Sequence, residues 1–162
     1  MVVVGIDPGT ATTGYGFIRE THDGLTLIEF GTIVTPAKIP PEERLVILHT
    51  QLTKLLLLHR PESGAVEKLY FQRNVTSALS VGQARGVILL SFAESGIPVF
   101  EYNPLDVKQA VSGYGGADKA QVQQMVRTIL GLEHIPRPDD AADALAIAIC
   151  HLHSQKMNRL LA

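Results

Sequence analysis

Hydrophobic positions in the N-terminal part of the chain follow the pattern of extended strands. Residues 2–7 are a β-branched run that ends at the turn signal Asp7-Pro8-Gly9, and residues 14–20 have the composition of a second strand. The pair Asp23-Gly24 is typical of a tight hairpin, and an extended pattern follows it as far as Val34. We therefore predict three consecutive antiparallel strands.

The spacing of apolar residues changes after Pro40 and Pro41. Leucines recur at helical spacing from Glu42 to about His59, and Pro61 closes the segment, so we predict an amphipathic helix. Short apolar runs typical of buried strands follow at 64–69 and 97–101, and helical patterns cover about 76–94, 104–112, 118–130 and 139–156.

This order of elements predicts an α/β fold. A meander of three strands, followed by strands that alternate with helices, favours a mixed five-stranded sheet with its first three strands antiparallel and helices on both faces. No repeat, linker or shift in composition divides the 162 residues. We therefore expect one domain over residues 1–162, large enough to bury a core without disulfides or a structural metal.

The cysteine content and the apolar runs bear on the compartment. Cys150 is the one cysteine of the chain, so an intramolecular disulfide is impossible and a cysteine-based zinc site is excluded. The chain starts directly with a strand-like run rather than a signal peptide, and no apolar run approaches the length of a membrane span. We expect a cytoplasmic protein that does not interact with membranes.

The net charge of −2 at first argues against a nucleic-acid partner, because DNA-binding domains usually carry a basic excess. If four acidic residues form a site neutralised by two divalent cations, the bound protein becomes net positive. The remaining lysines and arginines can then form a local basic patch. Net charge therefore decides little.

Four acidic residues lie where predicted elements begin or end. Asp7 follows the first strand, Glu67 lies in the fourth, and Asp140 and Asp143 open the last helix. The i, i+3 spacing of Asp140 and Asp143 puts both carboxylates on one helix face. Carboxylates from two neighbouring strands and the last helix would converge in a sheet of this order, and such a group suits hard divalent cations.

Each of these acids also has an ordinary structural interpretation. Asp7 before Pro8 and Gly9 is a good turn former, and Glu67 is a plausible charge at a strand end. Asp140 is a candidate helix N-cap with Asp143 in the first turn. The neighbouring Asp139 complicates the choice of ligand. The functional interpretation therefore depends on the four acids as a group.

Four stretches of the sequence resemble the conserved blocks of the RuvC family of Holliday junction resolvases, in the ribonuclease H-like superfamily. They are GIDPGTATTGYG at 5–16, VEKLYFQRNVTSALSVGQARG at 66–86, VKQAVSGYGGADKAQV at 107–122 and PDDAADALAIAICH at 138–151. The resemblance covers essentially the whole chain, and a set of blocks in this order is highly specific.

The resemblance implies a catalytic metal site and its ligands. It places two Mg²⁺ ions, for which Mn²⁺ could substitute, on Asp7, Glu67, Asp140 and Asp143, and leaves Asp139 outside the pattern. Two such ions would generate a nucleophile from water and relieve charge on the leaving oxygen of a phosphodiester. The expected activity is the resolution of four-way junction DNA by paired symmetric nicks in recombination and repair.

The resemblance also implies DNA contacts and protein partners. Lys108 and Lys119 flank a glycine-rich segment and match basic residues that contact phosphates, and Arg73 and Arg85 are further candidates. Tyr70 matches the aromatic residue that stacks on bases at the junction centre. A homodimer through the helix that contains Gly82 and Gly86 would match the two-fold symmetry of a junction. Branch-migration proteins similar to RuvA and RuvB are the implied partners.

Other interpretations remain open at this point. The acids alone would also suit a ribonuclease H-like nuclease that cuts RNA–DNA hybrids or other branched DNA, or a catalytically inactive junction-binding protein if they fail to converge. The GIDPGT stretch is similar to the first phosphate loop of sugar kinases, but those proteins need two such domains. His151 and His153 lie two residues apart on a helix, which argues against a shared metal.

Overall fold

The computed structural model of the chain contains five strands and five helices within residues 1–9, 11–69 and 75–162, which are the residues the structure describes. Their order confirms the predicted meander followed by alternating strands and helices. The elements are β1 (Val2–Asp7), β2 (Thr12–Thr21), β3 (Gly24–Val34), α1 (Pro41–His59), β4 (Ser63–Glu67), α2 (Val75–Glu94), β5 (Val99–Tyr102), α3 (Pro104–Ser112), α4 (Lys119–Ile129) and α5 (Asp139–Leu161).

The strands form one mixed sheet in the order β3-β2-β1-β4-β5. The pairs β1/β2 and β2/β3 are antiparallel, whereas β4 is parallel to both β1 and β5. Because β1 and β4 run in the same direction, their carboxyl ends, at Asp7 and Glu67, lie side by side at one edge of the sheet. The predicted sheet is therefore confirmed in strand number and direction.

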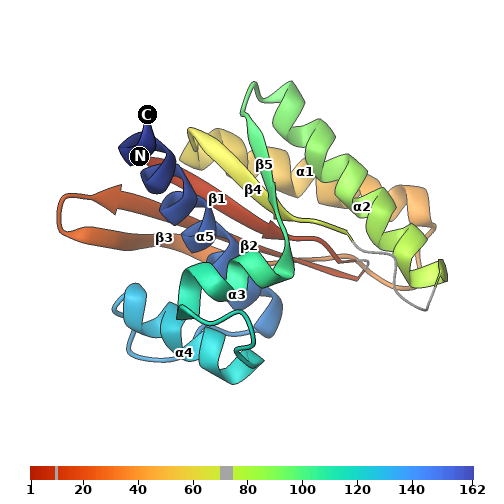
Figure 1. Cartoon of the computed structure of the whole chain (residues 1–162). Helices are drawn as coiled ribbons and strands as arrows, with labels where there is room; N and C mark the ends of the chain where they lie inside the picture. Colours follow the sequence, from red (N-terminus) through yellow and green to blue (C-terminus); the bar gives the residue numbers. More distant parts are fainter. Residues whose placement is uncertain (10, 70–74) are drawn as a thin grey trace.

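Helices cover both faces of the sheet, as predicted (Figure 1). On one face α1 and α2 pack over the side chains of Val4, Ile6 and Phe17. On the other face α5 lies along β1 and β2, and α3 and α4 pack against α5. Since β1 is covered on both sides, its central residues are all apolar or glycine, which explains its β-branched run.

The largest difference between an observed and a predicted boundary is at the C-terminal end of the last helix. α5 runs to Leu161 rather than 156, because its final turns continue beyond the part packed on the sheet, with Leu160 and Leu161 exposed. At the other end, Pro138 is the N-cap and Asp140 lies in the first turn, so the interpretation of Asp140 as the capping residue is wrong.

The expectation that no apolar run reaches membrane-spanning length is also corrected. Among the described residues one helix, α2, is long and apolar enough to cross a membrane, judged by length and composition alone. Its most apolar stretch has a mean hydropathy of 1.3, and 22% of that stretch is buried. Its inner side contributes Ala84, Ile88 and Phe92 to the core against α1 and the sheet. Its outer side leaves Val75, Leu79 and Leu90 exposed.

Candidate metal centre

The two strand-borne acids project from the sheet on the same face. Side chains alternate along a strand, so Asp7 shares its face with Val3 and Gly5, and Glu67 shares its face with Ser63 and Ala65. This is the face covered by α5, because Val3 and Ala65 both belong to the core that α5 helps to form. Asp7 and Glu67 therefore point toward the helix that carries the other two acids.

Glycines on β1 and β2 let α5 approach the sheet closely enough to bring its acids to Asp7. A Cβ added at Gly14 would lie 1.9 Å from the backbone oxygen of Asp140, and one added at Gly5 would lie 2.1 Å from that of Ala144. Gly14 is also the ladder partner of Asp7. Any side chain at this position would push the first turn of α5 away from the carboxylate beside it.

The first turns of α5 present Asp140 and Asp143 toward Asp7. Ligand atoms of these three carboxylates all lie within 4.8 Å of one another, although the residues are far apart in the sequence. Oxygen donors at this spacing fit a hard divalent cation such as Mg²⁺, which prefers carboxylate ligands. Glu67 lies outside this group of three and borders it.

The acids are close enough to perturb one another electrostatically. Burial, reinforced by the charges of Asp143, Glu67 and Asp140, raises the pKa of Asp7 to about 8. Burial also raises the pKa of Asp143 and of Glu67, and the charge of Asp143 adds to the effect at Glu67. The positive charge of a bound cation would favour the ionised forms instead, so the cluster is electrostatically suited to a metal.

Two predicted phosphate-binding lysines lie at this site. Lys108 and Lys119 line a cavity of about 290 Å³ together with Glu67 and Asp143, over an apolar floor that includes Ile147. Lys119 Nζ lies 3.4 Å from Asp143 Oδ2. Burial disfavours the charged lysine, but Asp143 and Asp139 outweigh it and raise the pKa of Lys119. Lys119 therefore stands beside the acids as a cation.

Asp139 lies outside the group of three acids and shares Lys119 with Asp143, since its Oδ2 lies 3.4 Å from Lys119 Nζ. Its Oδ1 accepts hydrogen bonds from Gln123 Nε2 at 3.1 Å and from Arg137 Nη1 at 2.6 Å. The bond from Gln123, together with Lys119 and Arg137, lowers the pKa of Asp139. Its position agrees with its exclusion from the predicted ligand set.

Arg85, a further predicted DNA-contacting residue, lies apart from the acids. Arg85 forms an ion pair with Glu101 and so ties α2 to β5. Glu101 alternates with Phe100 and Tyr102 along β5, which puts this pair on the sheet face opposite α5. Tyr70 and Arg73 lie outside the described residues.

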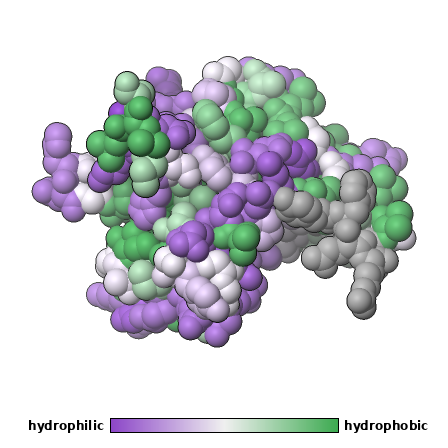
Figure 2. All heavy atoms as spheres, in the orientation of Figure 1, coloured by the Kyte–Doolittle hydropathy of each residue, from purple (hydrophilic) through white to green (hydrophobic). Residues whose placement is uncertain are grey.

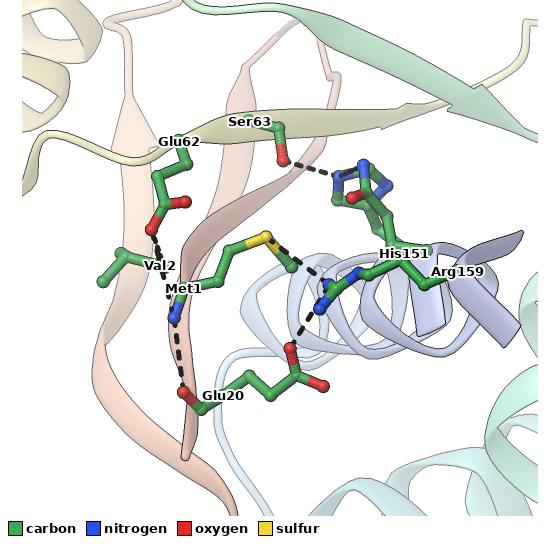
Figure 3. Close-up of polar contacts among 8 residues, drawn as sticks. Met1, Val2, Glu20, Glu62, Ser63, His151 and Arg159 are labelled. Carbon is green, nitrogen blue, oxygen red and sulfur yellow. Dashed lines mark hydrogen bonds and ion pairs between the residues drawn. The ribbon is translucent and has the colours of Figure 1, made fainter. Parts of the chain in front are cut away.

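A second polar cluster on α5 was not foreseen from the sequence. His151 is fully buried; its Nε2 lies 2.8 Å from Ser63 Oγ and its Nδ1 lies 2.8 Å from the Tyr102 hydroxyl. Figure 3 shows the imidazole reaching Ser63 from α5. The exposed His153 instead contacts the Ala110 carbonyl oxygen, so the two histidines share no site, as expected from their spacing.

These features define a class of protein before any relative is considered. A mixed sheet with three antiparallel leading strands, and carboxylates from its first strand and its last helix in one cluster, is characteristic of ribonuclease H-like nucleases. The family model for the crossover junction endodeoxyribonuclease RuvC matches residues 3–151. The chain belongs to the RuvC family.

Individual relatives agree with this assignment over almost their full length. A crossover junction endodeoxyribonuclease RuvC from Syntrophomonas wolfei is 55% identical over 161 residues, which cover 99% of this chain and 94% of the relative. One from Chloroflexus aurantiacus is 58% identical over 154 residues, covering 95% of this chain and 94% of the relative.

Solved structures of Holliday junction resolvases also match the fold. T. thermophilus RuvC in complex with a Holliday junction substrate superimposes with a TM-score of 0.93 at 41% identity, covering 98% of this chain and 96% of that one. The yeast mitochondrial Holliday junction resolvase Ydc2 has a TM-score of 0.71 at 16% identity, with coverage of 97% and 81%, and supports the fold alone.

Proposed function

We propose that this chain is a Mg²⁺-dependent endonuclease that resolves Holliday junctions by paired symmetric nicks, in recombination and DNA repair. The observation that carries the proposal is the meeting of Asp7, Asp140 and Asp143 within 4.8 Å, in a chain that belongs to the RuvC family. The chain would act as a single nuclease domain over residues 1–162, in the cytoplasm.

The proposed ligands are Asp7, Glu67, Asp140 and Asp143. Two Mg²⁺ ions held there would supply charge neutralisation at the scissile phosphate and acidity to water. The protein fixes the ligands in advance: Asp7 and Glu67 are on paired strands, and Asp140 and Asp143 are one turn apart on a helix pressed against glycine. Because the scaffold is rigid, little reorganisation accompanies the reaction.

Positive side chains would hold the DNA backbone beside this cluster. Lys108 and Lys119 line the same cavity as Glu67 and Asp143, so a phosphate that contacts them lies next to the acids. Arg73 and Arg85 are proposed as further backbone contacts, and Tyr70 as a residue that stacks on a base at the junction centre. The pairing of Arg85 with Glu101 means that it would have to exchange partners.

Two copies of the chain would form a dimer through the outer sides of their α2 helices, and the dimer would bind one junction. Val75, Leu79, Gly82, Gly86 and Leu90 follow one another at spacings of three or four residues and share one helix face. Val75, Leu79 and Leu90 are exposed, and a Cβ added at Gly86 would meet nothing within 4 Å. This apolar face accounts for the hydropathy of α2 and suits a symmetric dimer.

Branch-migration proteins similar to RuvA and RuvB are proposed as partners. They would bring the junction to the dimer.

Cleavage of a synthetic four-way junction, with a linear duplex and an RNA–DNA hybrid of the same sequence as controls, tests the proposal. We expect symmetric nicks in Mg²⁺ or Mn²⁺, and binding without cleavage in Ca²⁺, which is larger and tolerates six to eight ligands. Preferential cleavage of the hybrid, or robust nicking of the junction in Ca²⁺, would contradict it.

A further inference from the structure

The loop between α3 and α4 exposes an aromatic side chain to which no role has been assigned. Tyr114 lies between Lys108 and Lys119 in sequence, and it is 64% exposed. Exposed tyrosines are common, so exposure alone decides nothing. The fixed geometry of Tyr114 and the groove beside it are what distinguish it.

Hydrogen bonds on both sides fix the backbone of Tyr114. Its N–H donates to Ser112 Oγ at 3.3 Å, and its carbonyl oxygen accepts from the Ala117 N–H at 3.1 Å. The preceding Gly113 caps α3 in the left-handed conformation, with φ 74°. The loop is ordered without a partner, so binding through it would not pay the entropy of ordering it.

The ring of Tyr114 lies against the backbone of Gly116. A Cβ added at Gly116 would lie 2.6 Å from both Cζ and the hydroxyl oxygen of Tyr114. Only glycine leaves room for the ring in this position. The hydroxyl end of the ring is therefore held against the loop itself.

The ring also forms one wall of an open groove of about 490 Å³ between the loop and α4. Ala117 and Ala120 line the groove with small side chains, Met125 adds an apolar wall, and Gln121 and Gln124 contribute amides. Gln121 Oε1 is used to cap α4, where it accepts from the Asp118 N–H at 2.9 Å. Gln124 is exposed, and its amide offers a donor and an acceptor to an occupant.

The groove and the cavity beside the acids lie on different sides of the first turn of α4. The groove is lined by Asp118 and Ala120, whereas Lys119 between them lines the cavity beside the acids and contacts Asp143. The groove is therefore next to Lys119 along α4, and DNA whose phosphates meet Lys119 would lie near it. An aromatic wall next to a phosphate-binding lysine is the combination with which proteins hold unpaired nucleotides.

We propose that Tyr114 and the groove beside it form a nucleoside-binding subsite, in which one unpaired base of the DNA substrate stacks on the Tyr114 ring. The inference depends on the proposed function, since it takes junction DNA as the ligand. The stacking contact would depend on the aromatic ring and not on charge, whereas the neighbouring lysine contacts with phosphates would depend on charge.

The salt dependence of junction binding separates these two kinds of contact. Tyr114→Ala should weaken binding of a synthetic four-way junction about 5- to 150-fold, the range for one base stacked on an aromatic residue, with an unchanged slope of log K against log salt. Tyr114→Phe should stay within about twofold of the unaltered protein, because it keeps the ring. Lys119→Ala is the matched control, and it should reduce the slope by about one.

A fluorescent base locates the subsite. With 2-aminopurine placed in turn at each position around the crossover, we expect one position to be quenched on binding. Tyr114→Ala should abolish that quenching, Tyr114→Phe should retain it, and Gly116→Ala should reduce it because the added Cβ displaces the ring. Unchanged affinity and quenching in Tyr114→Ala would overturn the inference, as would equal losses in Tyr114→Phe and Tyr114→Ala.

The proposed function can fail separately. If the unaltered protein neither binds nor nicks the junction, the proposed function itself is wrong. If the unaltered protein both binds and nicks the junction, and the Tyr114 variants behave in the same way, the proposed subsite alone is wrong.

Discussion

Two of the places where helix α5 contacts the sheet through polar side chains differ in how their charges and hydrogen bonds are satisfied. Near its N-terminus, Asp140 and Asp143 meet Asp7 in a cluster of like charges. Two to three turns further on, the buried His151 meets Ser63 (Figure 3) and Tyr102, and hydrogen bonds satisfy both of its ring nitrogens. A bound cation would relieve the repulsion at the first place, whereas the second is satisfied within the protein.

The pKa shifts express this difference. Burial and neighbouring carboxylates raise the pKa of Asp7 to about 8, and burial lowers that of His151 to about 4. Both shifts favour the neutral form, but only at the acids do like charges contribute to the shift. Unrelieved repulsion on a rigid scaffold is a property of binding sites, and a satisfied buried network is a property of cores.

The strongest test of the comparison is to remove one acid. Asp7→Asn should reduce nicking by on the order of a thousandfold or more, because a metal ligand is lost. Junction binding should be retained or slightly stronger, since a negative charge near the phosphates is removed. Parallel gel-shift and cleavage assays measure both effects.

Asp139→Asn is the matched control for this experiment and should have little effect on nicking, since Asp139 is paired with Arg137 and Gln123. Loss of folding together with activity in Asp7→Asn would instead make Asp7 a structural residue.

The next largest effect is expected from the glycine beneath Asp140. Gly14→Ala places a Cβ 1.9 Å from the Asp140 backbone oxygen, so the first turn of α5 must move. We expect a loss of about 3 kcal/mol in the free energy of unfolding, as for other overpacked positions. Calorimetric titration with Mn²⁺ should show weakened binding as well. Full Mn²⁺ affinity in a folded variant would show that α5 need not lie this close.

The pH dependence of stability should have opposite signs at the two places. Asp7 has a raised pKa in the folded protein, so without metal its contribution to the free energy of unfolding is lost as the pH rises from about 4 toward 8. His151 has a lowered pKa, so its contribution is lost as the pH falls from about 6.5 toward 4. Urea unfolding in a chelating buffer measures both slopes.

Between pH 6.5 and 8 only the acidic cluster should make stability depend on pH. Asp7→Asn should therefore flatten the pH dependence of stability in this range, and Mg²⁺ should remove it in the unaltered protein. A slope that neither change affects would refute the assignment of this dependence to the cluster.

The smallest effect is expected within the histidine network. Ser63→Ala removes one partner of His151 and should cost about 1 kcal/mol in the free energy of unfolding. Gln155 Nε2, 3.4 Å from the same ring nitrogen, can take over part of the contact. Nicking by the folded protein should be unchanged. A selective loss of nicking without loss of stability would show that the second place also serves the reaction.

Much of the fold could be predicted because its signals are local. The β-branched run of β1, the Asp23-Gly24 hairpin and the leucine spacing of α1 each specify an element with little help from tertiary structure. The acids could be nominated because each lies where an element begins or ends. Their convergence follows from strand order, which periodicity alone does not fix, and the family resemblance supplied that step.

What could not be predicted depends on contacts between distant residues. In the sequence Gly14 stands out only as part of Gly14-Tyr15-Gly16. No local pattern indicates that a helix residue 126 positions further along the chain packs against it. The partners of His151 lie on β4 and β5, so its network is invisible to spacing along α5. The pairing of Arg85 with Glu101 likewise requires the packing of α2 on the sheet.

The position of Asp140 and Asp143 near the start of the last helix bears on when cutting can begin. A ribosome releases β1 and β4 first, and domains generally fold from the N-terminal side as synthesis proceeds. Asp7 and Glu67 are thus present in the nascent chain long before their two partners emerge. An unfinished copy would lack the proposed metal centre, because Asp140 and Asp143 reach Asp7 only when α5 docks on the glycines of β1 and β2.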